Sequence, residues 1–190
     1  SAKDKTVTLL KDVTLDKMLV ITTSDLTLDL GGHTISADPS WVYDDSNPNS
    51  CHLLQIGNDG VETKNVTILN GKLEATDGNK HTLNVYKADN VTLGDNLTVD
   101  HANGHTGAPL VINDSDVTVT GKVNFVTGDN SWYAVNIDSK GDKASLTFAD
   151  NAVVDLGTSG TGIQVDGSTA TNPVAVEFGS NVTVSGTTNP

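Results

Sequence analysis

The sequence predicts an all-β fold: a right-handed single-stranded parallel β-helix (a solenoid) with three short strands per turn and about six to seven turns. Three observations support this prediction. An apolar–Thr–apolar triplet recurs along the chain, two further apolar pairs accompany each copy, and no window of the sequence shows a convincing helical stripe of apolar residues.

The triplet follows a polar residue in each copy and occupies 6–9, 25–28, 65–68, 90–93, 116–119 and 145–148, with a variant at 175–178. Such triplets alternate apolar and polar side chains, which is typical of a strand with one buried face. The residues at the centre of the triplets are Thr8, Thr27, Thr67, Thr92, Thr118, Thr147 and Glu177.

Two more apolar pairs flank each triplet, such as Leu83/Val85 before it and Leu97/Val99 after it. A repeat of three short strands cannot bury its own apolar side, so successive repeats must stack on one another. Right-handed coiling follows from the strong preference of parallel crossover connections. Asn-Gly steps such as Asn70-Gly71 could instead turn the hairpins of a sandwich or propeller. Matching residue types at equivalent positions of consecutive repeats favour stacking.

The segment Leu26-Thr-Leu-Asp-Leu-Gly-Gly-His-Thr-Ile35 resembles the "LDLNGHTI" turn of the pectate-lyase-like β-helix family. That family includes polysaccharide lyases, glycoside hydrolases, phage tailspikes and bacterial surface adhesins. The resemblance therefore implies a fold more strongly than an activity. The chain is most similar in character to the bacterial cell-surface adhesin modules.

Composition narrows the classes of partner. The 190 residues form one expected domain, 1–190, which we interpret as a segment of a larger surface protein. The net charge is -13, and all 11 basic residues are Lys. This charge argues against nucleic acid and against anionic membrane surfaces. No stretch is long and apolar enough for direct membrane insertion, and we expect a secreted or cell-surface location.

The loops between the third strand of one turn and the first strand of the next are expected along one edge of the rod. They comprise residues 36–52, 76–81, 100–108, 127–132 and 156–161. Exposed aromatic rings on such loops are suited to stacking against sugars. The candidate ligand-binding residues on this edge are Trp41, Tyr43, His101, His105, Trp132 and Tyr133, with His81 nearby.

The outward face of the first-strand sheet adds further candidates. Amide side chains recur there at the same position of successive turns, with Val111 in one of them, and a tyrosine follows two residues later in one turn. Such a row could bind successive hydroxyls of an extended glycan, or it could simply be a solvated sheet surface. The residues concerned are Gln55, Asn84, Tyr86, Asn136 and Gln164.

No catalytic or metal-binding residue is assigned. The family's lyases usually use a Lys or Arg base, but the chain has no Arg, and no Lys occupies the outward positions of that sheet. Asp138 and Asp166 should stack on successive turns, where Ca²⁺ binding is more plausible than glycan cleavage. His101 and His105 have a zinc-like spacing but lie in a Gly-containing loop. We therefore expect no cofactor, with Ca²⁺ left open.

These observations favour a non-catalytic extracellular adhesin that binds a glycan, or a host or neighbouring-cell surface. Two alternatives remain at this point. The chain could be a structural spacer that extends another domain from the cell. It could also be a fragment of a polysaccharide lyase or glycoside hydrolase whose catalytic turns lie elsewhere.

Overall fold

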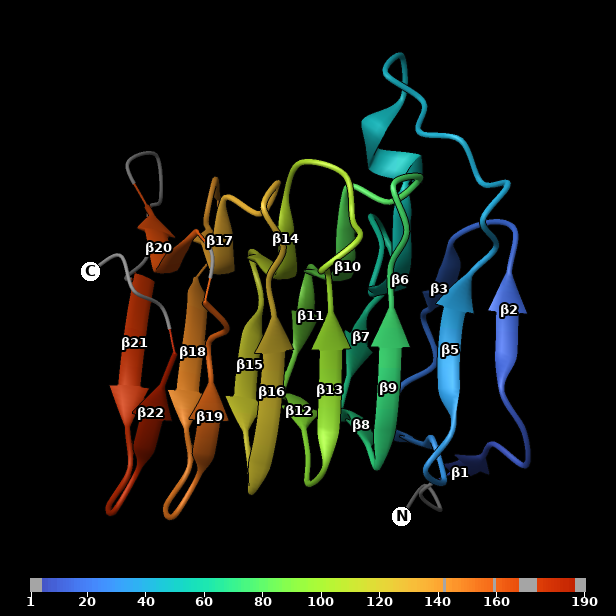
Figure 1. Cartoon of the computed structure of the whole chain (residues 1–190). Helices are drawn as coiled ribbons and strands as arrows, with labels where there is room; N and C mark the ends of the chain where they lie inside the picture. The colour runs from blue at the N-terminus through green and yellow to red at the C-terminus, as the bar shows by residue number, and fades with distance from the viewer. Residues whose placement is uncertain (1–4, 142, 159, 168–173, 187–190) are drawn as a thin grey trace.

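The computed structural model describes residues 5–141, 143–158, 160–167 and 174–186, and it confirms the parallel β-helix. Three parallel sheets enclose one core (Figure 1). Sheet A contains β1 (Lys5–Thr8), β4 (Leu26–Asp29), β8 (Val66–Leu69), β12 (Val91–Leu93), β15 (Asp116–Val119), β18 (Ala144–Phe148) and β21 (Val174–Phe178). Sheet B contains β2 (Val13–Leu15), β5 (Thr34–Ala37), β9 (Gly71–Glu74), β13 (Leu97–Asp100), β16 (Lys122–Val126), β19 (Val153–Asp155) and β22 (Thr183–Ser185). Sheet C contains β3 (Leu19–Ile21), β6 (His52–Ile56), β10 (His81–Tyr86), β14 (Ala108–Asn113), β17 (Tyr133–Asp138) and β20 (Thr161–Asp166).

The chain visits the sheets in the order A, B, C in every coil. In Figure 1 the strands of sheet B run upward at the front, those of sheet A run downward behind them, and the coil advances from right to left, which makes it right-handed. Short strands β7 (Thr63–Lys64) and β11 (Ala88–Asp89) pair with each other between sheets C and A. In the described ranges the helical structure is the 3₁₀ turn η1 (Pro48–Ser50), and no helix there is long and apolar enough to cross a membrane.

The triplets pair laterally, as the repeat predicts. Thr92 lies beside Thr67 on one side and beside Thr118 on the other. The apolar residues that flank each central Thr point inward and are buried in the middle coils, as at Val66 and Ile68. Where the sequence left Val153 or Val154 open, Val154 is the buried residue and Val153 is exposed.

Polar residues before the triplets turn the chain at the corner between sheets C and A. Asp25, Asn65 and Asn90 have φ angles of 57°, 56° and 53°, in the left-handed region that Asn and Asp tolerate better than most residues. Their side chains also form a ladder. The Asn65 amide donates to Asp25 at 2.7 Å, and the Asn90 amide donates to Asn65 at 2.7 Å. The corner therefore explains why a polar residue recurs before the triplet.

Candidate functional site: the loop-edge groove

The connections from sheet B to sheet C lie along one edge of the solenoid, at the top of Figure 1, as expected. The first is the longest and includes η1. We call this surface the loop edge. Its connections comprise residues 38–51, 75–80, 101–107, 127–132 and 156–160.

A groove of about 710 Å³ opens between four of these connections. The loops of this edge were predicted from the sequence, but the residues that line the groove were not. The sequence pattern that could have predicted the lining is a recurring run of small and polar residues in the loops, as in Thr76-Asp-Gly-Asn79 and Thr127-Gly-Asp-Asn130. The lining residues are Pro39, Thr76, Asp77, Ala102, Asn103, Gly104, Gly128, Asp129 and Asn130.

Main-chain hydrogen bonds tie each loop to the next. The amide of Lys80 donates to the carbonyl of Cys51 at 2.8 Å, that of His105 to Asn79 at 2.9 Å, and that of Trp132 to Gly107 at 2.8 Å. The groove is therefore built on loops that are fixed relative to one another, which lowers the entropic cost of binding a ligand.

Glycines allow two of the loops to approach the backbone of the preceding one. A Cβ atom at Gly78 would collide with the carbonyl oxygen of Trp41, and one at Gly128 with that of Ala102. No side chain fits at either contact, so these positions require glycine for close packing rather than for loop flexibility.

The aromatic residues of the loop edge divide into two groups. Trp132 is 50% exposed and belongs to the same loop as Gly128, Asp129 and Asn130 of the groove. Trp41, expected as an exposed ring, is half-buried and packs against the hydrophobic core. The ring is covered because Trp41 stands near the start of the long loop, where it packs against the core and its main chain contacts Gly78 of the next loop.

The other two aromatic candidates are partly buried. Tyr43 stacks on His105, with ring centroids 3.9 Å apart and planes 5° from parallel. This contact fixes the long loop to the third loop of the edge. Tyr133 begins β17 and lies beside Thr161 in sheet C.

A cluster of histidines that the sequence analysis did not assemble lies beneath the loop edge. The rings of His52 and His81 stack on adjacent coils with centroids 5.1 Å apart. His101, expected as an accessible candidate, is only 1% exposed, so it cannot contact a ligand in this conformation. The alternation of β6 and β10 provided a signal, since His52 and His81 each stand two residues before a buried leucine. We call His52, His81 and His101 the histidine cluster.

Burial keeps the cluster neutral. Loss of hydration, together with a smaller effect from the charge of Lys80, lowers the pKa of His52 to about 4. Burial also lowers the pKa of His101 to about 4. For His81 burial is again the main cause of a lowered pKa, followed by its histidine neighbours. His101 Nε2 donates to the carbonyl of His105 at 2.9 Å, and Nδ1 lies 3.0 Å from the hydroxyl oxygen of Thr82, which itself donates to the carbonyl of Asp100 at 2.9 Å.

The amide row of sheet C is largely structural, which corrects the expectation of an accessible face. Gln55 and Asn84 are only 7% and 4% exposed. The Asn84 amide donates to Gln55 at 3.0 Å, and the Asn113 amide donates to Asn84 at 2.7 Å. Buried amides need such partners, so this ladder holds three coils together and is not available to a ligand.

Asn136 and Gln164 continue the amide row toward the C-terminal coils, where they lie laterally paired and half-buried. They are separated from Asn84 by Val111, which occupies the equivalent position of β14. Sheet C therefore does not present one uninterrupted row of amides.

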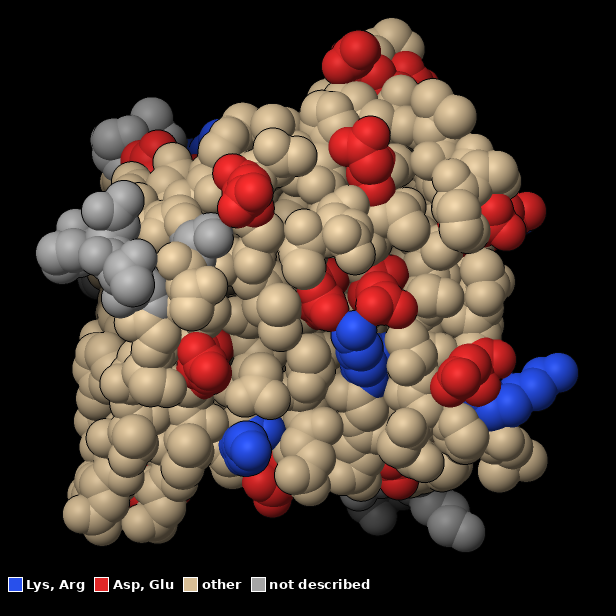
Figure 2. Space-filling model, in the orientation of Figure 1, with Lys and Arg blue, Asp and Glu red and all other residues tan. Residues whose placement is uncertain are grey.

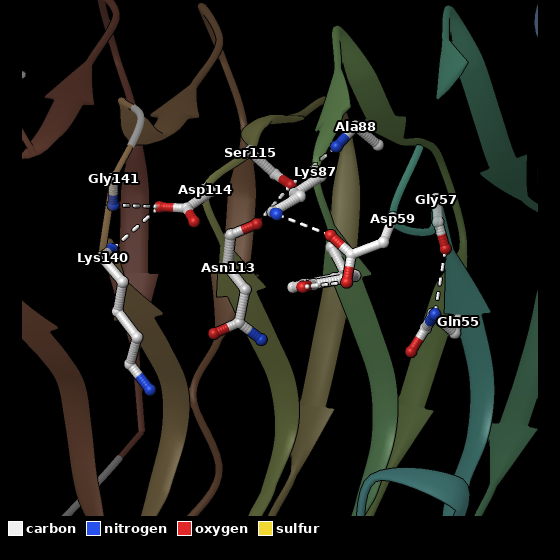
Figure 3. A network of polar contacts seen from close by, with 11 residues as sticks. Gln55, Gly57, Asp59, Lys87, Ala88, Asn113, Asp114, Ser115, Lys140 and Gly141 are labelled. Carbon is white, nitrogen blue, oxygen red and sulfur yellow. Dashed lines mark hydrogen bonds and ion pairs between the residues drawn. The ribbon is translucent and has the colours of Figure 1, made fainter. Parts of the chain in front are cut away.

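The end of sheet C carries a second polar network (Figure 3). Asp59 accepts hydrogen bonds from the Tyr86 hydroxyl at 2.9 Å and from the Lys87 ammonium at 2.6 Å. Burial and the bond to Asp59 raise the pKa of Tyr86, and the bond to Lys87 lowers the pKa of Asp59. On the adjacent coils Asp114 accepts from the main-chain amide of Lys140 at 2.9 Å. These contacts tie consecutive corners together.

Charge on the front of the molecule is predominantly acidic. Figure 2 shows acidic side chains over the loop edge, while the basic side chains in that view lie mostly lower. The groove is lined by two acidic residues, Asp77 and Asp129, and by no lysine. An anionic ligand would therefore be disfavoured there.

Within the described residues, no group of three or more His, Cys, Asp or Glu side chains could hold a metal ion. Asp138 and Asp166 are lateral neighbours, as expected. His101 and His105 meet through ring nitrogen and main-chain carbonyl rather than through two ring nitrogens. Comparison with protein-family models, curated proteins and solved structures found no match.

Proposed function

We propose that this chain is a non-catalytic extracellular module that binds a neutral glycan in the loop-edge groove, as part of an adhesin on a bacterial surface. The groove itself is the observation that carries the proposal. It has a volume of about 710 Å³ and extends across four successive loops that main-chain hydrogen bonds fix in place.

The lining suits a ligand rich in hydroxyl groups. It offers the exposed amides of Asn103 and Asn130 and the exposed carboxylates of Asp77 and Asp129. Amides both donate and accept hydrogen bonds, and carboxylates accept strongly from hydroxyls. The two carboxylates disfavour sulfated or uronate sugars, so a neutral glycan is the better match.

The half-exposed ring of Trp132 supplies the apolar part of such a site. Sugars combine hydroxyl edges with apolar C–H faces, and indole rings bury large areas when they stack. Trp132 stands two residues after Asn130 of the groove lining, so a glycan that extends beyond the groove along this loop would meet the ring.

The polar network at the end of sheet C does not favour catalysis. The hydrogen bond from Lys87 to Asp59 raises the pKa of the lysine, with Tyr86 adding to the effect. A general base needs a lysine that loses its proton near neutral pH, which requires a lowered pKa. Lys87 is therefore suited to an ion pair rather than to proton abstraction.

We expect Trp132→Ala to weaken glycan binding about tenfold or more, which corresponds to about 1.5 kcal/mol. The ligand is first found on an array of neutral, sulfated and uronate glycans, and its affinity is then measured by calorimetric titration. Asp77→Asn with Asp129→Asn should weaken binding to a neutral glycan and relax the rejection of sulfated ones. Val42→Ala is the matched control, because Val42 is an exposed apolar residue of the first loop of this edge, at 80%, and is not in the loop that carries Asp129, Asn130 and Trp132.

Each other outcome identifies a different function. Equal affinity of the wild type and the Trp132 variant would place binding away from the groove. If no glycan binds, the result would favour the alternative that the chain is a structural spacer. Release of shortened products from pectin-like polymers would support the enzyme fragment instead.

A further inference from the structure

The third connection of the loop edge, residues 101–107, lies directly on a histidine ring. This loop contributes Ala102, Asn103 and Gly104 to the lining of the groove. A Cβ atom at Gly104 would collide with the ring of His101, so the main chain of the loop is in contact with that ring. The position of three lining residues therefore depends on the histidine cluster beneath them.

The end of the same loop is fixed by His81. The main-chain amide of Ala108, the first residue after the loop, donates to Nδ1 of His81 at 3.1 Å. A ring nitrogen accepts a hydrogen bond only when it carries no proton, so this contact requires a neutral ring with its proton on Nε2. A proton on Nδ1 would place two N–H groups face to face and break the bond.

The surroundings of His81 offer no charge that would stabilise a protonated ring. Within the described residues, the titratable groups that face it are His52, His101 and Lys80, all of them basic. The His52 ring stacks on it with centroids 5.1 Å apart, and the buried Nδ1 of His52 has no hydrogen-bond partner. Burial and these neighbours hold the pKa of His81 well below its ordinary value.

His101 tolerates a proton better than His81 does. The titratable groups that face it are Asp100, whose carboxylate is already in an ion pair, and His105. Its Nδ1 faces the hydroxyl oxygen of Thr82, which donates its own proton elsewhere and can accept from a protonated ring. Burial opposes a charge on His101, but its contacts do not. The ring that accepts from the main chain is therefore the more sensitive of the two.

We propose that protonation of His81 detaches the loop 101–107 and dismantles the groove, so that a ligand bound at neutral pH is released in mildly acidic surroundings. Detachment hydrates the ring and lets it keep its proton, so acid shifts the population toward the open loop. A ligand favours the closed loop, because three lining residues belong to it. The release of a ligand rests on the proposed function, whereas the opening of the loop does not.

The size of the effect follows from the ordinary pKa of histidine. Below about pH 6.5 the open loop binds a proton on His81 and the closed loop does not, so the opening equilibrium rises about 20-fold between pH 7 and pH 5. His101 lies under the same loop, and its pKa of about 4 in the folded chain adds a similar factor when opening hydrates it. The loop is therefore most firmly closed above pH 6.5 and loosens as the pH falls.

Hydrogen exchange of single amides, followed by NMR without any ligand, tests the opening. The amides of His105 and Ala108 report on the loop, because they donate to the carbonyl of Asn79 and to the ring of His81. Their protection, corrected for the intrinsic pH dependence of exchange, should fall by more than about 20-fold from pH 7 to pH 5. His81→Asn keeps an oxygen acceptor near the place of Nδ1 and does not titrate, so its fall should be at least about fivefold smaller.

His33→Gln is the matched control, because it removes a histidine at a corner between sheets A and B, outside the histidine cluster. Its protection should fall as that of the wild type does. A fall of less than about threefold in the wild type, or an equal fall in His81→Asn, would overturn the proposal. Circular dichroism at both pH values confirms that each protein is folded before its exchange is interpreted.

Calorimetric titration with the tightest-binding neutral oligosaccharide from the array measures the release. The wild type should bind it at least about threefold more weakly at pH 5 than at pH 7, and His81→Asn should lose less affinity. Both proteins keep Asp77 and Asp129, so a direct effect of acid on the groove is common to the two. Equal affinity at both pH values would overturn the release. If no oligosaccharide binds at either pH, the proposed function fails, and the exchange measurement still decides whether the loop opens.

Discussion

Acidification from pH 7 to pH 4 is expected to destabilise the fold by on the order of 3 kcal/mol for each of His52 and His101, with His81 adding to the loss. The figure follows from pKa values of about 4 in the folded state against an ordinary value of 6.5. Both side chains are buried, so solvent screening does not remove the effect.

The direction follows from proton binding in the two states. Between pH 6.5 and pH 4 the unfolded chain binds protons on these histidines and the folded chain does not. Stability therefore is full above pH 6.5 and falls as the pH falls toward 4. The loss should begin at the loop edge, because the histidine cluster lies beneath it.

Urea unfolding at a series of pH values measures this loss. His52→Leu should reduce the slope of unfolding free energy against pH, because it removes one of the groups that bind a proton only in the unfolded chain. The fold should tolerate the change, because the buried Nδ1 of His52 has no hydrogen-bond partner to lose. Leucine fills a similar volume and carries no group that titrates. Curves of equal slope for the wild type and the variant, whether superimposed or separated by a constant offset, would contradict the prediction.

Truncation of a fully buried ring is expected to have one of the largest effects of any single substitution in the core. Phe148→Ala should lower the unfolding free energy by about 3–5 kcal/mol, because Phe148 is fully buried and its removal leaves a cavity. The stacked Phe178 lies one coil further on, with ring centroids 5.1 Å apart.

Phe178→Ala is the matched comparison, because it removes the same side chain from a position that is 59% exposed. We expect it to cost no more than about 1 kcal/mol, because most of this ring is already exposed to solvent in the folded chain. Urea unfolding of both variants at low protein concentration tests the pair. Equal losses would show that the last coil is buried in solution.

The parallel coil could be predicted from the sequence because residues at equivalent positions of successive repeats become lateral partners in the sheets. Thr67, Thr92 and Thr118 stand at equivalent places in three repeats and lie side by side in sheet A. The position of the loop edge followed from the same repeat. Period-2 alternation is a local property, so it can be seen without knowledge of the packing.

The accessibility of single side chains could not be predicted in this way. Gln55 and Asn84 occupy outward positions, yet they are buried and bonded to each other. Trp41 lies in a loop and still packs against the core. Alternation assigns a face to a residue, but what covers that face depends on loops and corners contributed by other coils.

The groove arises from the same stacking. Its lining residues come from four loops that are separated by a full coil each, so no single segment contains the site. Glycines at the loop contacts let the coils approach closely, and the corner ladders of Asp25, Asn65 and Asn90 hold the spacing. The groove and the solenoid therefore depend on the same lateral register between successive coils.

Thiol bridging tests that register most directly. In a Cys51→Ala background, Thr67→Cys with Thr92→Cys places two thiols on adjacent strands, about 4.8 Å apart along the rod. A reagent that spans only a few ångströms should link this pair rapidly. It should fail to link Thr67→Cys with Thr118→Cys, which are two coils apart. Equal linking of both pairs, or linking of neither, would contradict the stacked coil on which the groove depends.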